Sequence, residues 1–433
     1  MSAPDDRPAV PAESPAADPP GQGAATKHAD DPENRWTTAF REIVGGSWGV
    51  SVGAVVLAIL AGSILIVATD ESVRAASAYF FSRPGDMLNA IGAAAGDAYA
   101  ALFRGAVWNY RADSFGDGIR PLMVSLNYAT PLIGSGLGLA VGVRAGLFNI
   151  GGQGQMILAA IGAGWIGFAL QLPWPLHMLL AIAVGMLTGA LWAAIAGVLK
   201  AVTGAHEVIT TIMLNHIAFY LLFFLLATPG LLQAPGSANP KTPPMESSAV
   251  MPKIFGSGYH LHLGFVFALL AVAVTWWLME RSKLGFTFRA VGENPHAARV
   301  AGIDVGRTTV WVMVVSGALV GLAGVTQVLG TSTTGFSTDV DAGMGFDAIT
   351  VALLGRSNPL GVLAAAILFG AFRAGGATMQ AAEGIPIEIV TVIQSLIVLF
   401  IAAPPLVRAI FRLPKPGAAP RPKAGDPAKE VTA

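Results

Sequence analysis

Long apolar runs recur along this chain and restrict it to folds that lie within a lipid bilayer. The first run, Ile43–Thr69, contains no charged residue over 27 positions, and about 20 apolar residues are enough for a helix to cross the hydrocarbon core. Further crossings are expected at about Ile119–Gly142, Met156–Leu170, Leu176–Leu199, Val208–Ala227, Leu261–Leu278, Thr308–Leu329, Val362–Met379 and Ile387–Val407. Together with a half-length apolar piece at Phe346–Leu354, they predict an all-α polytopic membrane protein with about ten transmembrane segments.

Composition supports this class and excludes several functions. Hydrophobic residues make up 54% of the chain and charged residues 12%, whereas soluble domains carry about 25% charge. The net charge is zero, so we expect no nucleic-acid partner. The chain has no cysteine, and its seven histidines show no metal-ligand spacing. No nucleophile and base, and no paired acids, converge in the sequence, so we expect no catalytic residue, no metal site and no enzymatic activity.

The sequence divides into a membrane domain and two tails. Residues 1–42 and 408–433 are rich in proline and alanine and are predicted to be disordered and cytoplasmic. The transmembrane domain is expected to occupy residues 43–407. Within it, residues 70–117 are predicted to lie outside the cytoplasm with an interfacial helix at about Pro84–Trp108, which is either a docking surface for another protein or a lid over the helix bundle.

The distribution of Lys and Arg orients the domain. With both tails inside, 18 of these residues fall in cytoplasmic segments and 6 in the outer loops. Cytoplasmic loops carry the excess of basic residues. We therefore predict a multi-pass protein of the cytoplasmic (inner) membrane with both termini in the cytoplasm and membrane lipid around it.

One loop is too polar to enter the membrane. Residues 281–307, RSKLGFTFRAVGENPHAARVAGIDVGR, lie between two apolar runs and carry five basic residues, which places them at the cytoplasmic surface. Asn294 is suited to cap a short helix, Pro295 to open it, and Gly302 to end it in the left-handed conformation. The predicted helix, Pro295–Ala301, is too short to be stable without a packing partner. Taken alone, it is equally well explained as an ordinary connector.

Three motifs in chain order favour a functional role for this loop. The stretches GLFNIGGQGQ (146–155), FRAVGENPHAARVAGIDVGR (288–307) and FDAITVALLGRSNPLGVLAAAILFGAF (346–372) resemble the permease subunits of bacterial ABC importers. They are most similar to the branch that handles nucleosides and simple sugars such as ribose. The resemblance extends from about Ile119 to Ala402. It implies that Pro295–Ala301 docks into a groove on a separate ATPase subunit.

The resemblance also implies partners and site residues. The ATPase-coupling residues are expected to be Arg289, Glu293, Asn294, Pro295, Ala298, Arg299 and Gly302. ATP and Mg would be held by the ATP-binding cassette subunit, because this chain contains no GxxxxGK[ST] phosphate loop. A second permease, identical or homologous, and a periplasmic or lipoprotein substrate-binding protein complete the expected assembly.

The first candidate for the translocation path is the glycine-rich stretch GLFNIGGQGQ. Its glycines interrupt a helix, and freed backbone groups at membrane depth need a protein or water-filled lining. Asn149, Gln153 and Gln155 would then offer amide groups to a polar solute. A tight cytoplasmic turn after Arg144 is the other interpretation of the same residues.

Polar residues within apolar runs are further candidates. Asn215 and His216 occupy an otherwise apolar crossing, and such residues usually face the interior of a helix bundle. For His216, hydrogen-bonded packing is the alternative to contact with the solute.

The second interruption surrounds Asp347. Phe346–Leu354 is too short to cross the membrane and predicts a half-length or re-entrant helix, and Arg373 lies inside the crossing that follows. One interruption in each of two pseudo-repeated halves points to a translocation site at the interface between the halves. We therefore add Asp347 and Arg373 to the candidate path.

Two other functions remain open at this stage. An ion-coupled secondary transporter of a small polar solute also uses inverted repeats and broken helices, and Asp347 is the acidic residue available to it. Within the ABC class, the solute is a nucleoside, a simple sugar or a branched-chain amino acid, because such importers take much of their selectivity from the separate binding protein.

Overall fold

The structure is a computed structural model that describes residues 47–237 and 239–411. This part of the chain is helical and contains no β-strand. Its helices are α2 (Ser47–Thr69), α3 (Glu71–Ser77), α4 (Pro84–Ala106), α5 (Phe115–Arg144), α6 (Gly152–Ala169), α7 (Leu176–Thr203), α8 (Glu207–Ala227), α9 (Gly264–Arg281), α10 (Lys283–Glu293), α11 (Pro295–Val300), α12 (Val305–Thr326), the π-helical turn η1 (Gln327–Thr331), α13 (Met344–Leu354), α14 (Pro359–Glu383), α15 (Ile387–Ala402) and α16 (Pro404–Phe411).

The apolar helices confirm an all-α protein of the membrane class. Among the described residues, six helices are long and apolar enough to span a bilayer, and up to eight if each of two bent helix pairs forms one span. α6 and α13 are not among them, since α6 begins with glycine and glutamine residues and α13 is too short. Length and hydropathy thus account for fewer crossings than the ten that the sequence predicted.

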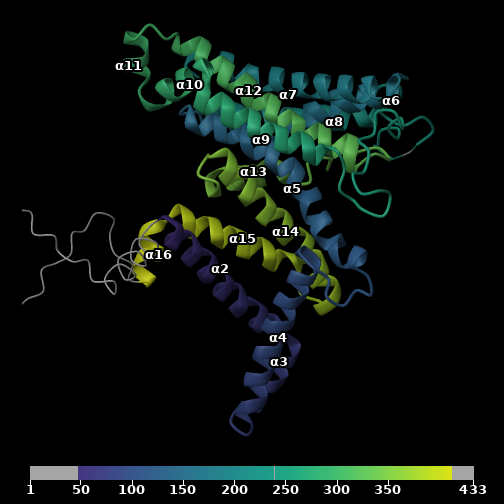
Figure 1. The fold of residues 1–433 in the computed structure, drawn as a ribbon, viewed down its shortest axis with the longest axis vertical. Coiled ribbons are helices and arrows are strands. Elements are labelled where there is room, and N and C mark those ends of the chain that lie inside the picture. The colour runs from purple at the N-terminus through teal and green to yellow at the C-terminus, as the bar shows by residue number, and fades with distance from the viewer. Residues whose placement is uncertain (1–46, 238, 412–433) are drawn as a thin grey trace, which may run out of the picture.

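The helices form two groups (Figure 1). In one group, α6, α7, α8, α9 and α12 lie side by side. In the other, α14 packs against α4, and α15 packs against α2. The long helix α5 contacts both groups through α12 and α14, and the short helix α13 lies between α5, α14 and α6. α5 and α13 therefore occupy the junction of the two groups.

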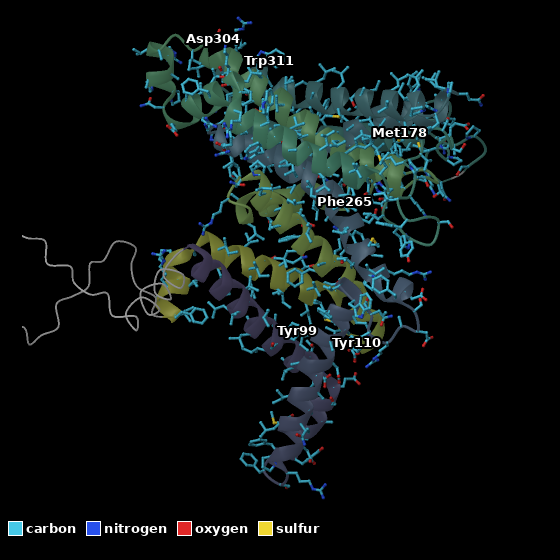
Figure 2. All side chains as sticks on the ribbon, viewed as in Figure 1. Tyr99, Tyr110, Met178, Phe265, Asp304 and Trp311 are labelled. Carbon is cyan, nitrogen blue, oxygen red and sulfur yellow. The ribbon has the colours of Figure 1, made fainter. Side chains whose placement is uncertain are left out.

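The first group has two distinct ends. Figure 2 shows Asp304 and Trp311 near the end where α10 and α11 project, and Met178 toward the opposite end. We refer to these as the α11 end and the opposite end. Arg144, the last residue of α5, bonds to Glu280 at the end of α9, so α5 ends at the α11 end.

Small residues bring the helices of the first group into close contact. A Cβ atom at Gly317 of α12 would lie 2.5 Å from the carbonyl oxygen of Gly189 in α7, and one at Gly138 of α5 would lie 2.5 Å from the carbonyl oxygen of Ser316. Close backbone approach increases van der Waals contact between helices that lipid alone does not drive together. The core therefore depends on these glycines as much as on its Leu and Ile side chains.

A non-helical segment interrupts the chain after η1. Residues 332–343 form turns and irregular backbone before α13 begins at Met344. Their backbone groups bond to the loop that precedes α9, since Met245 N donates to the Thr333 carbonyl oxygen (2.8 Å) and Thr242 N to that of Phe336 (3.1 Å). The predicted half-length helix, Phe346–Leu354, is thus confirmed in its position and its shortness.

His262 fixes the start of α9 against η1. Its Nδ1 accepts a hydrogen bond from Gly264 N (3.1 Å), and its ring lies against Gly330. The ring is buried and packs between the start of α9 and η1.

Helix boundaries differ from the predictions mainly at the ends of the chain and in the polar loop. The final crossing ends at Ala402, and α16 follows as a separate helix that packs on α2 and reaches Phe411, beyond the expected boundary at Val407. α14 begins at Pro359, before the expected start of its crossing at Val362, because Asn358 caps the helix by accepting a hydrogen bond from Leu360 N. The tail predicted at 1–42 falls outside the described residues, as do residues 412–433 of the tail predicted at 408–433, whereas residues 408–411 belong to α16.

Candidate functional site

The predicted coupling helix is present as α11. Asn294 caps it, with Oδ1 accepting hydrogen bonds from His296 N and Ala297 N (3.0 Å each), and Pro295 is its first residue. Gly302 follows at φ +83°, and Ile303 N donates to the Ala298 carbonyl oxygen (2.9 Å), an arrangement typical of a glycine that ends a helix. The capping residues read from the sequence are thus confirmed.

The side chains of α11 divide into one anchor and an exposed tip. Ala298 is buried against the rest of the chain, whereas Val300 is 91% exposed. Arg299 and Glu293 are also exposed. The exposed side of α11 thus presents one apolar and one basic side chain next to each other.

Sequence reasoning did not predict α10, the amphipathic helix that carries α11. Ser282 caps it by accepting a hydrogen bond from Gly285 N (3.0 Å), and Phe288 and Val291 are buried beneath it. On its polar side, Arg289 pairs with Glu280 (3.4 Å), and Glu280 also pairs with Arg144 (2.6 Å). One carboxylate thus links α9, α10 and the end of α5.

Two glycines bring α10 against the turn that follows α5. Gly146 has φ +72°, and a Cβ at Gly146 would lie 3.2 Å from the Cα of Gly292. A Cβ at Gly292 would lie 2.6 Å from the carbonyl oxygen of Arg144 and 2.7 Å from the carbonyl carbon of Ala145. Because backbone faces backbone here, the end of α10 and the turn are in direct contact without side chains between them.

The turn itself, residues 145–151, is held by a buried amide cluster. Asn149 Nδ2 donates to Ser316 Oγ (2.9 Å) and to Gln155 Oε1 (3.2 Å), while Asn149 Oδ1 accepts from Gly151 N (2.8 Å) and Gln155 Nε2 (3.1 Å). Asn215 of α8 accepts from Gly154 N (2.8 Å) and donates to the Ile150 carbonyl oxygen (2.9 Å). Asn149, Gln155 and Asn215 are all buried.

These contacts decide what the predicted path residues do in this conformation. The amides of Asn149, Gln155 and Asn215 bond to each other, to Ser316 and to backbone, and they tie the turn to α6, α8 and α12. His216, the neighbour of Asn215, is exposed on α8 and does not join the cluster. The arrangement therefore has the form of the tight turn that was one interpretation of GLFNIGGQGQ.

This arrangement gives a first testable expectation. Asn149→Ala should destabilise the protein by about 3 kcal/mol, because buried donors and acceptors on Ser316, Gly151 and Gln155 lose their partner. Thermal unfolding of the detergent-solubilised protein measures the loss, with the exposed Asn239→Ala as a control. Uptake by the folded fraction should keep its KM. A raised KM with unchanged unfolding temperature would instead place Asn149 in contact with the solute.

A second polar group lies at the start of α13. Arg373 of α14 pairs with Asp347 (Nη1 to Oδ2, 3.4 Å) and donates from Nη2 to the Ala342 carbonyl oxygen (2.6 Å). Its guanidinium lies over the ring of Tyr128 in α5, 5.8 Å from the centroid. The predicted residues Asp347 and Arg373 thus come together, and Tyr128, which sequence reasoning missed, joins them.

Gln153 belongs to the same region. Its side chain hydrogen-bonds the buried carboxylate of Asp341, and a Cβ at Gly345 would lie 2.4 Å from Gln153 N. The glycine-rich start of α6 and the irregular segment before α13 are therefore in direct contact. The two interruptions, which lie far apart in the sequence, therefore meet in space.

The charged side chains around these two polar groups are not arranged like metal ligands. Among the described residues, no group of three His, Asp or Glu side chains is placed to bind a metal ion. The charged groups are instead paired, as in Asp347 with Arg373 and Glu280 with Arg144. Two features remain. Polar side chains gather at the helix break before α13 and at the turn 145–151, and α10 connects that turn to the exposed helix α11.

Comparison of the sequence with known proteins identifies the family to which the chain belongs. Residues 122–402 match the family described as branched-chain amino acid transport system / permease component. The chain is a membrane permease of this family. The match begins in α5 and ends with α15, so it includes α11, the turn 145–151 and the helix break before α13.

Relatives of the permease are ABC transporter subunits. It is 37% identical to the guanosine ABC transporter permease protein NupP of Bacillus subtilis strain 168 over 72% of this chain and 89% of NupP. It is 34% identical to the nucleoside ABC transporter permease protein NupB of Lactococcus lactis subsp. cremoris strain MG1363 over 68% of this chain and 83% of NupB. The glucose ABC transporter permease protein TsgB13 of Haloferax volcanii is 33% identical over 63% of the permease and 73% of TsgB13. No solved structure matches the permease.

Proposed function

We propose that the permease is the membrane subunit of an ABC importer that takes up nucleosides and is driven by a separate ATPase subunit. The two relatives that match 72% and 68% of the chain carry guanosine or nucleoside in their names, which favours nucleosides over the glucose of TsgB13, whose match covers 63%. Family membership favours an ATP-driven subunit over an ion-coupled carrier. The assembly would also contain a second permease and a substrate-binding protein.

The proposed topology has ten crossings and both termini in the cytoplasm. The crossings are α2, α5, α6, α7, α8, α9, α12, the broken segment Ser332–Leu354, α14 and α15. α6 crosses despite its polar start, because the amide cluster satisfies the polar groups of its first turn. The α11 end then faces the cytoplasm, in agreement with the basic residues of the loop 281–307.

The observation that carries this proposal is the exposed tip of α11 on a rigid support. Val300 is 91% exposed, and burying a valine side chain contributes about 1.5–3 kcal/mol. Arg299 lies beside it and supplies a positive charge. We infer that the ATPase subunit covers this tip, with Arg289, Glu293, Asn294, Pro295, Ala298 and Gly302 shaping and supporting the helix.

Motion of α11 has a physical route to the translocation path. α11 continues from α10 at Asn294, and α10 touches the turn 145–151 through Gly292 and Gly146. The turn is tied by Asn149 to Ser316 of α12 and by Asn215 to α8. Rigid elements in contact can bias a two-state equilibrium at a distance. ATP-driven closure of the ATPase pair would thus change the balance between inward-open and outward-open states.

The gate in this proposal is the helix break before α13. Half-helix ends at the middle of the membrane bind polar solutes in other transporters, and the group formed by Asp347, Arg373, Tyr128 and Gln153 lies at such an end. Asp347 is already paired with Arg373, which suits an uncharged polar solute better than ion coupling.

A reconstituted transporter tests the function. The permease, its ATPase subunit and its second permease are placed in proteoliposomes with the binding protein outside, and radiolabelled guanosine uptake is compared with and without internal ATP. Val300→Asp should reduce ATP-driven uptake by about tenfold or more, since 1.4 kcal/mol is a factor of ten and a carboxylate replaces a buried apolar contact. Val300→Leu, which keeps the apolar tip, should retain uptake.

Two results would contradict the proposed coupling to an ATPase, and a third would contradict the proposed solute. Uptake that follows a proton or sodium gradient without ATP would establish an ion-coupled carrier. Full ATP-driven uptake by Val300→Asp, with the ATPase still bound, would show that α11 is not the contact. Glucose in place of guanosine as the transported solute would move the permease to the sugar class while leaving the coupling unchanged.

A further inference from the structure

A polar cavity lies between α4, α5 and α14, on the far side of the molecule from α11. Its volume is about 610 Å³, within the range of about 300–1,000 Å³ that small-molecule sites occupy. Tyr110, labelled in Figure 2, lies in the connection between α4 and α5 beside it. The polar residues that line this α4/α5/α14 chamber include Asn109, Asp113, Asp117, Arg120, Tyr128 and His260.

The walls of the chamber are fixed by close helix contacts. A Cβ at Gly105 of α4 would lie 2.2 Å from Thr378 Oγ1 of α14, and one at Gly118 of α5 would lie 2.9 Å from the ring of Trp108. Asn109 N also donates a hydrogen bond to the Gly118 carbonyl oxygen (2.9 Å). The cavity is therefore a built feature of the fold rather than a gap between loosely packed helices.

The mouth of the chamber carries paired but accessible charges. Arg120 Nη1 lies 3.3 Å from Asp117 Oδ1, and both side chains are about half exposed. Asp117 Oδ2 also accepts from Ser114 Oγ (2.6 Å). A guanidinium and a carboxylate held side by side present donors and acceptors to hydroxyl groups and to the edge of a heterocyclic base. The two charges of this pair cancel, and Asp113 adds a further carboxylate to the lining of the chamber.

The chamber leads to the helix break through Tyr128. This tyrosine lines the chamber and lies 5.8 Å from the guanidinium of Arg373. Arg373 in turn holds Asp347 and the carbonyl oxygen of Ala342 at the start of α13. Ala374 and Ala377 of α14 line the same wall. A continuous series of side chains thus joins the chamber mouth to the polar group at the break.

We propose that the α4/α5/α14 chamber is the outer solute site of the permease, where a neutral, hydroxyl-rich ring compound binds before it passes the break. Resting on the function proposed above, this inference assigns a nucleoside: Tyr128 stacks on the base, and the Asp117–Arg120 pair with Asn109 binds the sugar hydroxyls. Aromatic stacking and a few convergent polar groups are typical of sites for such compounds.

The absence of cysteine from the chain makes an accessibility experiment direct. Ala377 and Ala382 of α14 are both exposed, but only Ala377 lines the chamber. Ala382 lies five residues further along the helix and is rotated by about 140° from Ala377 around the helix axis. Ala377→Cys and Ala382→Cys each introduce a single thiol. In the assembled transporter, both are treated from outside with a negatively charged, membrane-impermeant methanethiosulfonate.

The expected result has two parts. Modification of Ala377→Cys should abolish guanosine uptake, and guanosine at ten times its Kd should slow that modification about tenfold by mass action. Modification of Ala382→Cys should leave uptake unchanged and proceed at the same rate with guanosine present. Tyr128→Ala should raise the KM for guanosine, while Tyr128→Phe, which keeps the ring, should not.

The outcomes separate this site from the function on which it rests. Uptake that remains ATP-driven while guanosine fails to protect Ala377→Cys would overturn the chamber and leave the importer intact. Protection by glucose but not by guanosine would overturn the assignment of a nucleoside. A wild-type transporter that takes up no nucleoside at all would overturn both proposals.

Discussion

Gly292→Ala is expected to reduce ATP-driven uptake by about tenfold or more while the ATPase subunit still binds. The added Cβ would lie 2.6 Å from the carbonyl oxygen of Arg144 and 2.7 Å from the carbonyl carbon of Ala145, so α10 must move away from the turn that it touches. Overpacking of this kind costs about 1–3 kcal/mol, and a coupling energy of that size corresponds to roughly 5- to 150-fold in an equilibrium. Uptake and co-purification of the ATPase, measured on the same preparation, test both halves of the expectation.

Gly306→Ala is the matched control for this prediction. Gly306 is also helical and lies near the same end, but the nearest atoms to its added Cβ would be 3.5 and 3.7 Å away. Both substitutions favour the helix by up to about 1 kcal/mol. A difference in uptake between the two variants therefore reports the steric overlap at Gly292. Normal uptake by Gly292→Ala and by the bulkier Gly292→Val would remove this contact from the proposed coupling route.

Loss of the Arg373 side chain is the second change from which we expect a large effect. Arg373→Met leaves Asp347 without its cation, the Ala342 carbonyl oxygen without its donor and Tyr128 without the guanidinium above it. The pair is partly accessible, with side-chain exposures of 30% and 41%, so the cost is below the 3–5 kcal/mol of a fully buried pair. A cost of about 1.5–3 kcal/mol corresponds to an uptake loss of about tenfold to a hundredfold.

Neutralising the partner distinguishes the possible roles of this pair. If Arg373 acts by compensating Asp347, the double variant Asp347→Asn/Arg373→Met should recover more uptake than Arg373→Met alone, because no unpaired carboxylate remains. A double-mutant cycle on uptake measures the coupling. Equal loss in the single and double variants would show that Arg373 acts mainly through Ala342 and Tyr128.

Long apolar runs predicted the positions of several membrane helices well, because such uncharged runs can form few structures other than a buried helix. Glu207–Ala227 and Leu176–Thr203, for example, begin within a residue of their expected positions. α10 was missed because its polar residues marked it as part of a loop, although Ser282 and the buried Phe288 and Val291 were visible signals of a capped amphipathic helix. The ends of α15 and α16 depend on packing against α2, which the sequence does not show.

Site residues were predicted less completely than helices. The caps of α11 follow local rules, so Asn294, Pro295 and Gly302 were identified from the sequence. Asn149, Gln155 and Asn215 were selected as polar residues in apolar surroundings, but the choice between bonding to each other and facing a solute is made by the fold. The partnership of Asp347 with Arg373, and the contacts of Tyr128 and Gly292, join segments far apart in the chain and had no sequence signal.

The hydrogen bonds between the 239–251 loop and the segment before α13 restrict how this permease can be altered. Surface loops usually tolerate exchange between homologues. Here the backbone amides of Thr242 and Met245 donate to the Phe336 and Thr333 carbonyl oxygens. A transplanted loop with a different backbone course, or with proline at either position, would leave those acceptors without a donor. Engineering a chimaera at this position therefore requires both segments from one parent, and natural variation in the two should be inherited together.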